Sequence, residues 1–283
     1  IDRETLNMDL SKLEAALTAE TKAVFAVNLL GNPNDFGQLC AFCDKHGLIL
    51  MEDNCESMGA VYDGRQAGTF GVFGTYSTFF SHHLCTMEGG FVVTDDEELY
   101  HYMLAIRAHG WTRNLPESSA LHIKNDNPFY ESFCFVVPGF NVRPLEMEGA
   151  LAVEQLKKLS GFVAQRRENA RYFKEKMATD VRFITQKEIC EASWFGFSMV
   201  LAQPNTEKRD RIVAHLRANG IETRPIVAGN FARQPVFPQL HASVAGELTA
   251  ADYIHDNGFF VGNHSIAMKD EIDYLCKVLG QVD

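Results

Sequence analysis

Short apolar stretches alternate with amphipathic segments along the first hundred residues. Residues 23–27 and 48–51 are predicted to be buried strands, and the segment 36–46 between them has the apolar spacing of a helix. Two further apolar stretches, 75–80 and 91–94, follow Gly-rich turns. Strands that alternate with helices are typical of a mostly parallel sheet with covered faces, so we expect an α/β fold.

The pattern changes in the second half of the chain. The segment 147–177 is rich in Leu, Ala, Glu, Lys and Arg and predicts a connecting helix with a break near Ser160-Gly161. The elements expected after it are an apolar strand at 195–201, a helix near 207–219 and a last helix at 270–279. We therefore expect a large domain over 1–165 and a small α+β domain over 166–283.

Composition narrows the class of protein. The chain has 283 residues, 46% of them apolar, and its formal net charge of −11 disfavours a nucleic-acid binder that depends on a basic surface. The seven cysteines are scattered, which is typical of a reducing compartment, so we expect a cytoplasmic protein. The longest apolar runs are far shorter than the roughly 20 residues that span a bilayer, and we expect no membrane partner.

Polar side chains gather where the first strands are predicted to end. They are Asp53, Glu56, Ser77, His82 and His83. Ligands of open α/β sheets bind at the carboxyl ends of strands, so these side chains are expected near a site. Carboxylates and imidazoles there could ligate a metal, act as acid and base, or hold a cofactor, and solvated loops contain the same residues. The spacing alone does not decide between these interpretations.

The order of several motifs is more informative. They are Glu52-Asp53-Asn54-Cys55-Glu56-Ser57, Ser81-His82-His83, Met87-Glu88-Gly89-Gly90 and Gly139-Phe140-Asn141-Val142-Arg143. This order resembles the sugar-modifying branch of the fold-type I pyridoxal-phosphate enzymes, the DegT/DnrJ/StrS family of nucleotide-sugar aminotransferases and dehydratases. The resemblance implies the fold-type I pyridoxal-phosphate transferase fold. It also implies a homodimer in which each subunit completes the cofactor site of the other.

The resemblance assigns a role to four of these side chains. Asp53 pairs with the pyridine nitrogen of the cofactor, Glu56 lies beside its phenolic oxygen, and Ser77 holds its phosphate. Asn141 reaches the phosphate of the neighbouring subunit's cofactor. A carboxylate at the pyridine nitrogen keeps that nitrogen protonated, because an opposite charge favours the charged form. Aminotransferases of the family usually carry Gln where this chain has Glu56, which points to a different reaction.

The largest departure from the family pattern is His82. Family aminotransferases have their Schiff-base lysine at this position, 29 residues after the Asp53 position, and the chain has no lysine between His46 and Ile123. An imidazole forms no imine, but its ordinary pKa near 6.5 suits it to proton transfer. In this respect the chain resembles the 3-dehydratases of the family.

The dehydratase resemblance implies a complete set of ligands. The cofactor is pyridoxal 5′-phosphate or pyridoxamine 5′-phosphate, bound without a covalent link, and glutamate is the amino donor. The substrate is a nucleotide-linked 4-keto-6-deoxy sugar, in particular the GDP-linked mannose derivative, and the pathway is that of lipopolysaccharide O-antigen sugars. His82 is the base that moves the proton when the hydroxyl on sugar carbon 3 leaves. We expect no iron–sulfur cluster, because the cysteines beyond Cys85 are far apart.

The diphosphate of such a substrate needs cations on an acidic protein. The candidates are His109, Arg113, Arg143 and Arg224. Arginine is a better phosphate ligand than histidine, because its planar guanidinium can donate hydrogen bonds to two phosphate oxygens at once. Surface salt bridges are the competing interpretation for each residue taken singly.

Three alternatives remain open. An aminotransferase of the same family would need the missing lysine, and a metal-dependent hydrolase would use Asp53, Glu56, His82 and His83 as ligands. A non-catalytic fragment is the third, because the backbone-amide phosphate cradle that family members carry near the N-terminus is not found. The Gly-rich stretch 64–74 does not follow a strand and open a helix as such a cradle does. We accordingly expect a large domain that is incomplete at its N-terminus.

Overall fold

The N-terminal half is built on a four-stranded sheet. The computed structural model describes residues 1–282, and its first sheet has the strand order β1-β2-β5-β6. The strands are β1 (Ala23–Val27), β2 (Ile49–Asp53), β5 (Phe73–Ser77) and β6 (Gly90–Val93). The first three run parallel and β6 is antiparallel to β5. The expected α/β arrangement is therefore present, with an antiparallel strand at its edge.

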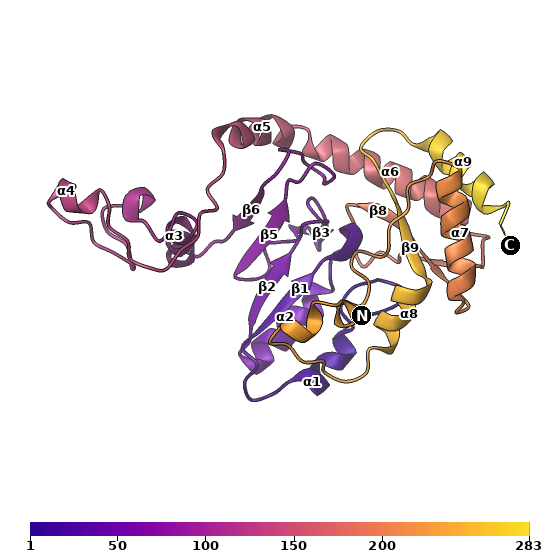
Figure 1. Cartoon of the computed structure of the whole chain (residues 1–283), viewed down its shortest axis with the longest axis horizontal. Coiled ribbons are helices and arrows are strands. Elements are labelled where there is room, and N and C mark those ends of the chain that lie inside the picture. Colours follow the sequence, from indigo (N-terminus) through magenta and orange to yellow (C-terminus); the bar gives the residue numbers. More distant parts are fainter. Residues whose placement is uncertain (283) are drawn as a thin grey trace.

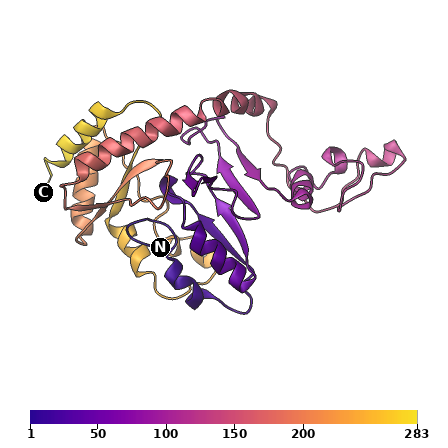
Figure 2. The same ribbon diagram turned by 180° about the vertical axis from the view of Figure 1, so that it is seen from behind.

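Helix α2 (Phe36–His46) covers one face of this sheet (Figure 2). The side chain of Asp35 accepts a hydrogen bond from the Gln38 N–H at its start, and Gly47 ends it at a φ of 62°, which glycine adopts without strain. Phe36 and Leu39 of the helix pack with buried strand residues in one apolar cluster. The predicted strand at 23–27 and helix at 36–46 are both confirmed. The shorter elements around this sheet are η1 (Leu10–Lys12), α1 (Leu13–Ala16), η2 (Leu29–Gly31), β3 (Val61–Tyr62) and β4 (Arg65–Gln66).

A long excursion follows the first sheet and stands away from the rest of the molecule (Figure 1). It contains α3 (Glu97–Ile106), η3 (Thr112–Asn114) and α4 (Pro128–Glu131), and the chain returns through α5 (Glu146–Leu156). We call residues 107–145 the arm. The arm exposes large apolar side chains, among them Phe129, Tyr130, Phe133, Phe140 and Val142.

The connecting helix predicted at 147–177 is two helices. Helix α5 ends at Leu156 and α6 runs from Leu159 to Met177. The predicted break is therefore confirmed, and it lies at Lys157 and Lys158, just before Ser160-Gly161. Ser160 and Gly161 lie in the first turn of α6, where backbone N–H groups have no intrahelical acceptor, so poor helix formers cost little there.

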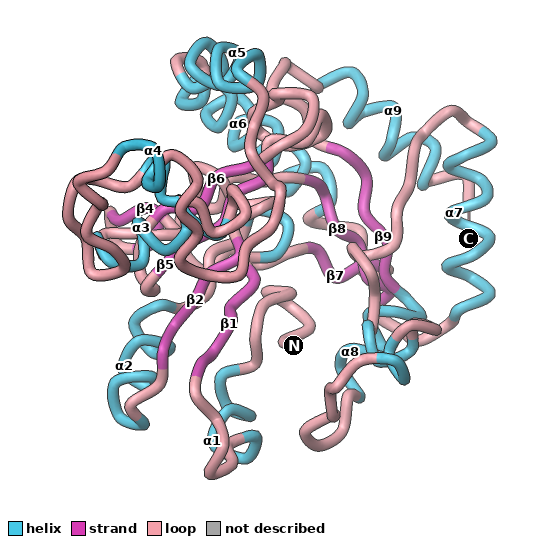
Figure 3. The backbone as a smooth tube through the Cα atoms, turned by 60° about the vertical axis from the view of Figure 1, so that its left-hand side comes forward, coloured by secondary structure: helices cyan, strands magenta, loops and turns pink. Residues whose placement is uncertain are grey.

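The C-terminal half packs helices on a second sheet (Figure 3). Its strands β7 (Phe183–Thr185), β8 (Gly196–Leu201) and β9 (Gly258–Gly262) form an antiparallel sheet in that order. The helices of this half are α6, α7 (Thr206–Ala218), α8 (Thr249–Asn257), α9 (Lys269–Leu279), and the short η4 (Phe231–Arg233) and η5 (Phe237–Gln239). The expected α+β character of this half is confirmed. Within residues 1–282, no helix is long and apolar enough to span a membrane.

Candidate functional site

The carboxyl ends of β2 and β5 bring the predicted cofactor residues to one edge of the first sheet. Asp53 is the last residue of β2 and pairs in register with Thr75, two residues before Ser77 at the end of β5. The Asp53 side chain accepts a hydrogen bond of 2.9 Å from the Cys55 N–H, and Ser77 Oγ accepts one of 3.2 Å from the Phe79 N–H. Because parallel strands end at the same edge, the two side chains share one rim of the sheet.

Glu56 lies on the same side, in the turn after β2. Its Oε2 accepts a hydrogen bond of 2.9 Å from the Leu30 N–H. Burial raises the pKa of Glu56 to about 7, against that hydrogen bond, and the nearby charge of Asp53 raises it further. A carboxyl with this pKa is substantially protonated near neutral pH and can donate a hydrogen bond, as the amide of Gln does.

His82 follows β5 in a short loop at the same edge. Its backbone N–H donates 2.9 Å to the Phe79 carbonyl, and its ring centre lies 5.2 Å from that of Phe195, just before β8. Nδ1 is buried and has no hydrogen-bond partner. Burial lowers the pKa of His82, and so do the positive charges of Arg166 and Arg224, whereas the backbone of Phe79 and the charge of Asp53 act in the opposite direction. The imidazole is therefore held neutral, which is the form of a base.

His83 has a different environment although it is the next residue. Its side chain is fully buried, and Nε2 lies 3.0 Å from the Ser193 carbonyl. Burial lowers the pKa of His83 to about 3. This residue ties the loop after β5 to the segment before β8 and offers the solvent no proton. The side chain of His83 is therefore held inside the protein, whereas that of His82 is partly exposed.

The structure gives no support to a metal centre at these residues. In the part of the chain that the structure describes, the one cluster of metal-ligand atoms is His122, Glu131 and Cys134, in the arm. Asp53, Glu56, His82 and His83 do not form such a cluster there.

The Gly-rich stretch after β4 is occupied by a carboxylate of the chain itself. The backbone N–H groups of Gly68, Phe70 and Gly71 donate to the buried Glu52 side chain over 2.5 to 2.8 Å. These donors are therefore not free for a phosphate. The prediction that this stretch is no phosphate cradle is confirmed.

A cleft of about 520 Å³ lies beside His82, between the loop after β5, helix α6 and strand β9. Among the predicted substrate residues, Arg224 lines it, and Arg224 pairs over 2.9 Å with Glu222. Sequence reasoning missed three further wall residues, which are Arg166, Phe195 and Asn263. These three residues belong to no recognisable sequence motif. Arg166 lies on a helix rich in Lys and Arg, so the sequence does not distinguish it from a surface cation.

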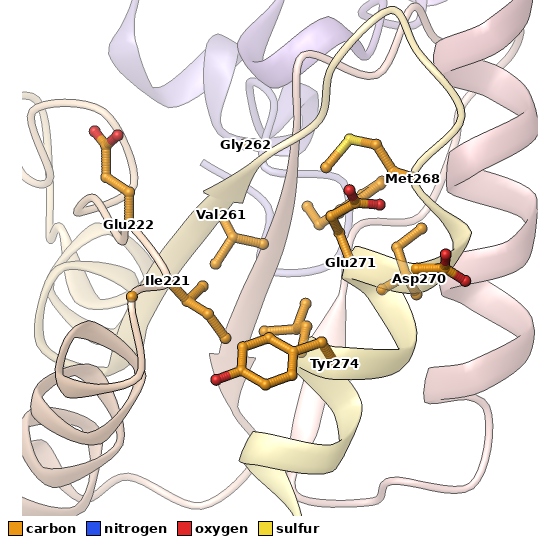
Figure 4. Close-up of a pocket in the computed structure, with 12 residues that line it drawn as sticks. Ile221, Glu222, Val261, Gly262, Met268, Asp270, Glu271 and Tyr274 are labelled. Atoms are coloured by element: carbon orange, nitrogen blue, oxygen red, sulfur yellow. The ribbon is translucent and has the colours of Figure 1, made fainter.

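A neighbouring pocket of about 460 Å³ shares Glu222, Gly262 and Met268 with the cleft. In Figure 4, Ile221, Val261 and Tyr274 surround it, with Asp270 and Glu271 on one side. It contains no residue that the sequence analysis selected.

The other predicted site residues lie in the arm and not in the cleft. Asn141 forms an isolated β-bridge with Ala108, and its Oδ1 accepts a hydrogen bond of 3.2 Å from Arg143 Nε. His109 has a φ of 65°, and the guanidinium of Arg113 stacks 3.7 Å above the ring of Trp111. Within this chain, the arm carries all four away from the edge that holds Asp53 and His82 (Figure 1). The structure thus does not bring them together with Arg224.

Comparison with known proteins defines the family. Residues 1–280 match the model of the DegT/DnrJ/EryC1/StrS aminotransferase family, and the chain belongs to this family. Over 99% of its length and 72% of the relative, it is 53% identical to the GDP-4-keto-6-deoxy-D-mannose 3-dehydratase of Yersinia pseudotuberculosis.

Two solved structures of GDP-4-keto-6-deoxymannose-3-dehydratase have the same fold as this chain. One is a His-to-Asn mutant with bound GDP-perosamine, and the other contains a trapped PLP-glutamate geminal diamine. Each is 51% identical to this chain with a TM-score of 0.95, over 99% of this chain and 73% of the other. The expected pyridoxal-phosphate transferase fold is therefore confirmed.

Proposed function

We propose that the chain is a pyridoxal-phosphate-dependent 3-dehydratase that acts on GDP-4-keto-6-deoxy-D-mannose in the synthesis of lipopolysaccharide sugars. The observation that carries this proposal is the position of His82, which lines a cleft beside the edge of the sheet where the strands of Asp53 and Ser77 end. The 53% identity to a dehydratase of this specificity supports the substrate.

The residues at the edge of the first sheet fit the cofactor. Asp53 would pair with its pyridine nitrogen, Ser77 would hold its phosphate, and Glu56 would donate a hydrogen bond to its phenolic oxygen. The raised pKa of Glu56 fits that role, because the protonated carboxyl is a donor. When bound, the group supplies an electron sink for a carbanion. Because residue 82 is His and not Lys, no imine would anchor the cofactor. Cofactor binding would therefore depend on these polar contacts.

His82 is the proposed proton carrier. His82 lines the cleft and its pKa is lowered, so the imidazole is neutral near neutral pH and can take up a proton and return it when the hydroxyl on sugar carbon 3 leaves. Phe195 and Phe79 pack on the imidazole and hold its orientation. His83 contributes by fixing the loop to Ser193, as a positioning residue without a proton of its own.

We propose glutamate as the amino donor and the diphosphate of the GDP-sugar as the group that Arg224 binds. The glutamate and the GDP-linked sugar in the two solved structures support these ligands. Arg224 is half exposed in the cleft wall, so its guanidinium is accessible to a diphosphate.

A homodimer would explain why four predicted site residues lie in the arm, away from the cleft. Its exposed Phe129, Phe133 and Phe140 need a covering surface. We propose that the arm lies against a second subunit, where Asn141 reaches the cofactor phosphate and His109, Arg113 and Arg143 reach the substrate.

Hybrid dimers test this arrangement. A dimer of one His82→Asn chain and one Asn141→Ala chain, purified through two different tags, retains one complete site. It should have about half the wild-type activity, although both parent dimers are nearly inactive. A hybrid no more active than its parents would contradict the shared site, and so would a fully active monomer.

We also propose a boundary between two domains inside α6, with a large domain over 1–165 and a small one over 166–283. The buried cluster of the C-terminal half draws its members from Ala170 to Leu279, and that of the first sheet from Val24 to Ala67. The free cysteines support a cytoplasmic location.

A 4-aminotransferase of the same family is the competing activity. It would require an amine nucleophile where His82 stands, and the structure puts no lysine in the cleft wall among residues 1–282. One assay separates the two activities. The chain is incubated with pyridoxal phosphate, glutamate and a panel of nucleotide-linked 4-keto-6-deoxy sugars, and the product mass is measured.

We expect a product that has lost the oxygen of carbon 3 and retains its keto group. A 4-amino sugar would contradict the proposal. Borohydride treatment of the cofactor-loaded chain should leave no cofactor attached to any lysine, and a covalent adduct would equally contradict it.

A further inference from the structure

Arg166 is a buried cation in the wall of the cleft. It lies on α6, is 4% exposed, and lines the same cavity as His82 and Arg224. Its charge is close enough to His82 to act on the pKa of that imidazole. No part of the proposed mechanism uses this residue.

No acidic side chain among residues 1–282 forms an ion pair with Arg166. Its Nη1 donates to the carbonyl oxygens of Phe195, over 3.2 Å, and of Asn263. Its Nε is buried and has no hydrogen-bond partner. None of the ion pairs found in residues 1–282 includes Arg166, so two neutral carbonyls are its ligands.

An unpaired buried charge is expensive, because the ion has lost its hydration without gaining an opposite charge. Burial accordingly lowers the pKa of Arg166 to about 10. The adjacent Arg167 shows the contrast, since it pairs with Glu191 over 3.0 Å at the surface. A cation that a protein keeps unpaired beside a cleft is a preorganised partner for an anion that enters the cleft.

We infer that Arg166 forms an oxyanion subsite that holds one anionic group of a ligand next to His82. This inference rests on the proposed function, which supplies two such groups: a carboxylate of glutamate and a phosphate of the GDP-sugar. The carboxylate is the favoured occupant. The α-carboxylate of glutamate is attached to the carbon that loses a proton, so it must lie near the base, whereas the diphosphate is joined to the sugar at a distance from the reacting carbons.

Two substitutions on the full-length cofactor-loaded protein test this subsite. Arg166→Gln removes the charge, and Arg166→Lys keeps the charge but loses the planar fork. Arg171→Gln is the matched control, because Arg171 lies on the same helix, is exposed and pairs with Glu168. Binding of glutamate and of GDP is measured separately, glutamate by the absorbance change of the cofactor and GDP by calorimetry.

For Arg166→Gln we expect the dissociation constant of glutamate to rise at least about tenfold while that of GDP changes less than about threefold. Arg166→Lys should fall between this variant and the wild type, and Arg171→Gln should bind both ligands normally. If GDP binding weakens and glutamate binding does not, the subsite stands and its occupant is the phosphate.

Unchanged binding of both ligands by a folded Arg166→Gln protein would overturn the inference. Failure of both Arg166 variants to fold would also overturn it, because Arg166 would then serve only to join α6 to Phe195 and Asn263. If the wild type itself binds neither ligand, the proposed function fails, and the subsite fails with it. The wild-type titrations therefore separate the two failures.

Discussion

The two sheets of this protein differ in how completely they are covered. All six residues of β8 in the C-terminal sheet are buried, whereas all four residues of β6 in the N-terminal sheet are exposed. Phe25 and Val27 of β1 are about half exposed as well. The C-terminal sheet thus buries its own core between helices, and the N-terminal sheet has one covered and one bare face. The site forms at the edge of the less covered sheet.

The two sheets therefore contribute differently to the protein. The C-terminal sheet contributes mainly to the stability of the fold, and the edge of the N-terminal sheet holds the groups that can react. Phe197 on β8 is stacked 4.4 Å from Phe173 of α6 in the C-terminal cluster. The edge of the first sheet instead collects groups that burial disfavours, such as the Glu56 carboxyl and the His82 imidazole. The stacked rings of the C-terminal cluster stabilise the fold. The buried titratable groups at the edge of the first sheet lower its stability, and their shifted pKa values are typical of functional sites.

The largest effect on stability is expected from truncation of a core ring in the C-terminal sheet. Phe197→Ala should lower the free energy of unfolding by about 3–5 kcal/mol, because Phe197 is 1% exposed and the substitution leaves a cavity. The matched substitution Phe25→Ala, at a side chain 50% exposed, should cost less than about 1 kcal/mol. Denaturant unfolding measures both. Equal losses would break the comparison between the two sheets.

A smaller effect of opposite sign is expected at Glu56. Its pKa is raised from 4.5 to about 7, so the folded chain retains a proton that the unfolded chain releases, and stability is lost as the pH rises from about 4.5 to 7. Glu56→Gln removes this cost and should stabilise the ligand-free protein by about 1–3 kcal/mol above pH 7.

The gain from Glu56→Gln should vanish below pH 4.5, where both states of the wild type are protonated. Unfolding curves of both proteins across this range provide the measurement. A destabilised variant at pH 8 would show that the carboxyl is paired and ionised in the folded state.

The sequence predicted the first sheet and the edge residues well, because strand periodicity and the order of motifs are local signals. The strand expected at 75–80 ends at Ser77, and the three residues after it leave the sheet to form the loop of His82. Strand β9 was not predicted, although its residues form a short apolar run directly after the polar end of α8. Its pairing with β8 is a tertiary contact that no local pattern records.

The candidate site was predictable only where a motif marks it. Asp53, Ser77 and His82 share one edge because parallel strands end together, a geometric rule that a sequence reveals. Arg166 and Asn263 reach the cleft through the packing of α6 against the C-terminal sheet. The placement of His109 and Arg143 in the arm depends on a long excursion whose direction the sequence does not specify.

A still smaller effect is expected on the pH dependence of deoxygenation. The lowered pKa of His82 places the acid limb of the rate profile below 6.5, because the base acts in its neutral form. Arg224→Gln removes one positive charge that lowers this pKa, so the midpoint of the acid limb should move to higher pH. Rates measured at saturating substrate test this shift. A midpoint that stays in place or moves to lower pH would show that the charge of Arg224 does not act on the base.

The central claim is that His82 moves the proton in a deoxygenation, and the substitution His82→Asn tests it most directly. An amide has no usable base, so the rate of oxygen loss from carbon 3 should fall by about 10²–10⁴-fold, while the thermal midpoint of the ligand-free protein stays close to that of the wild type. His241→Asn, at an exposed histidine outside the cleft, is the matched control and should retain normal activity. Near-normal deoxygenation by His82→Asn would contradict the account.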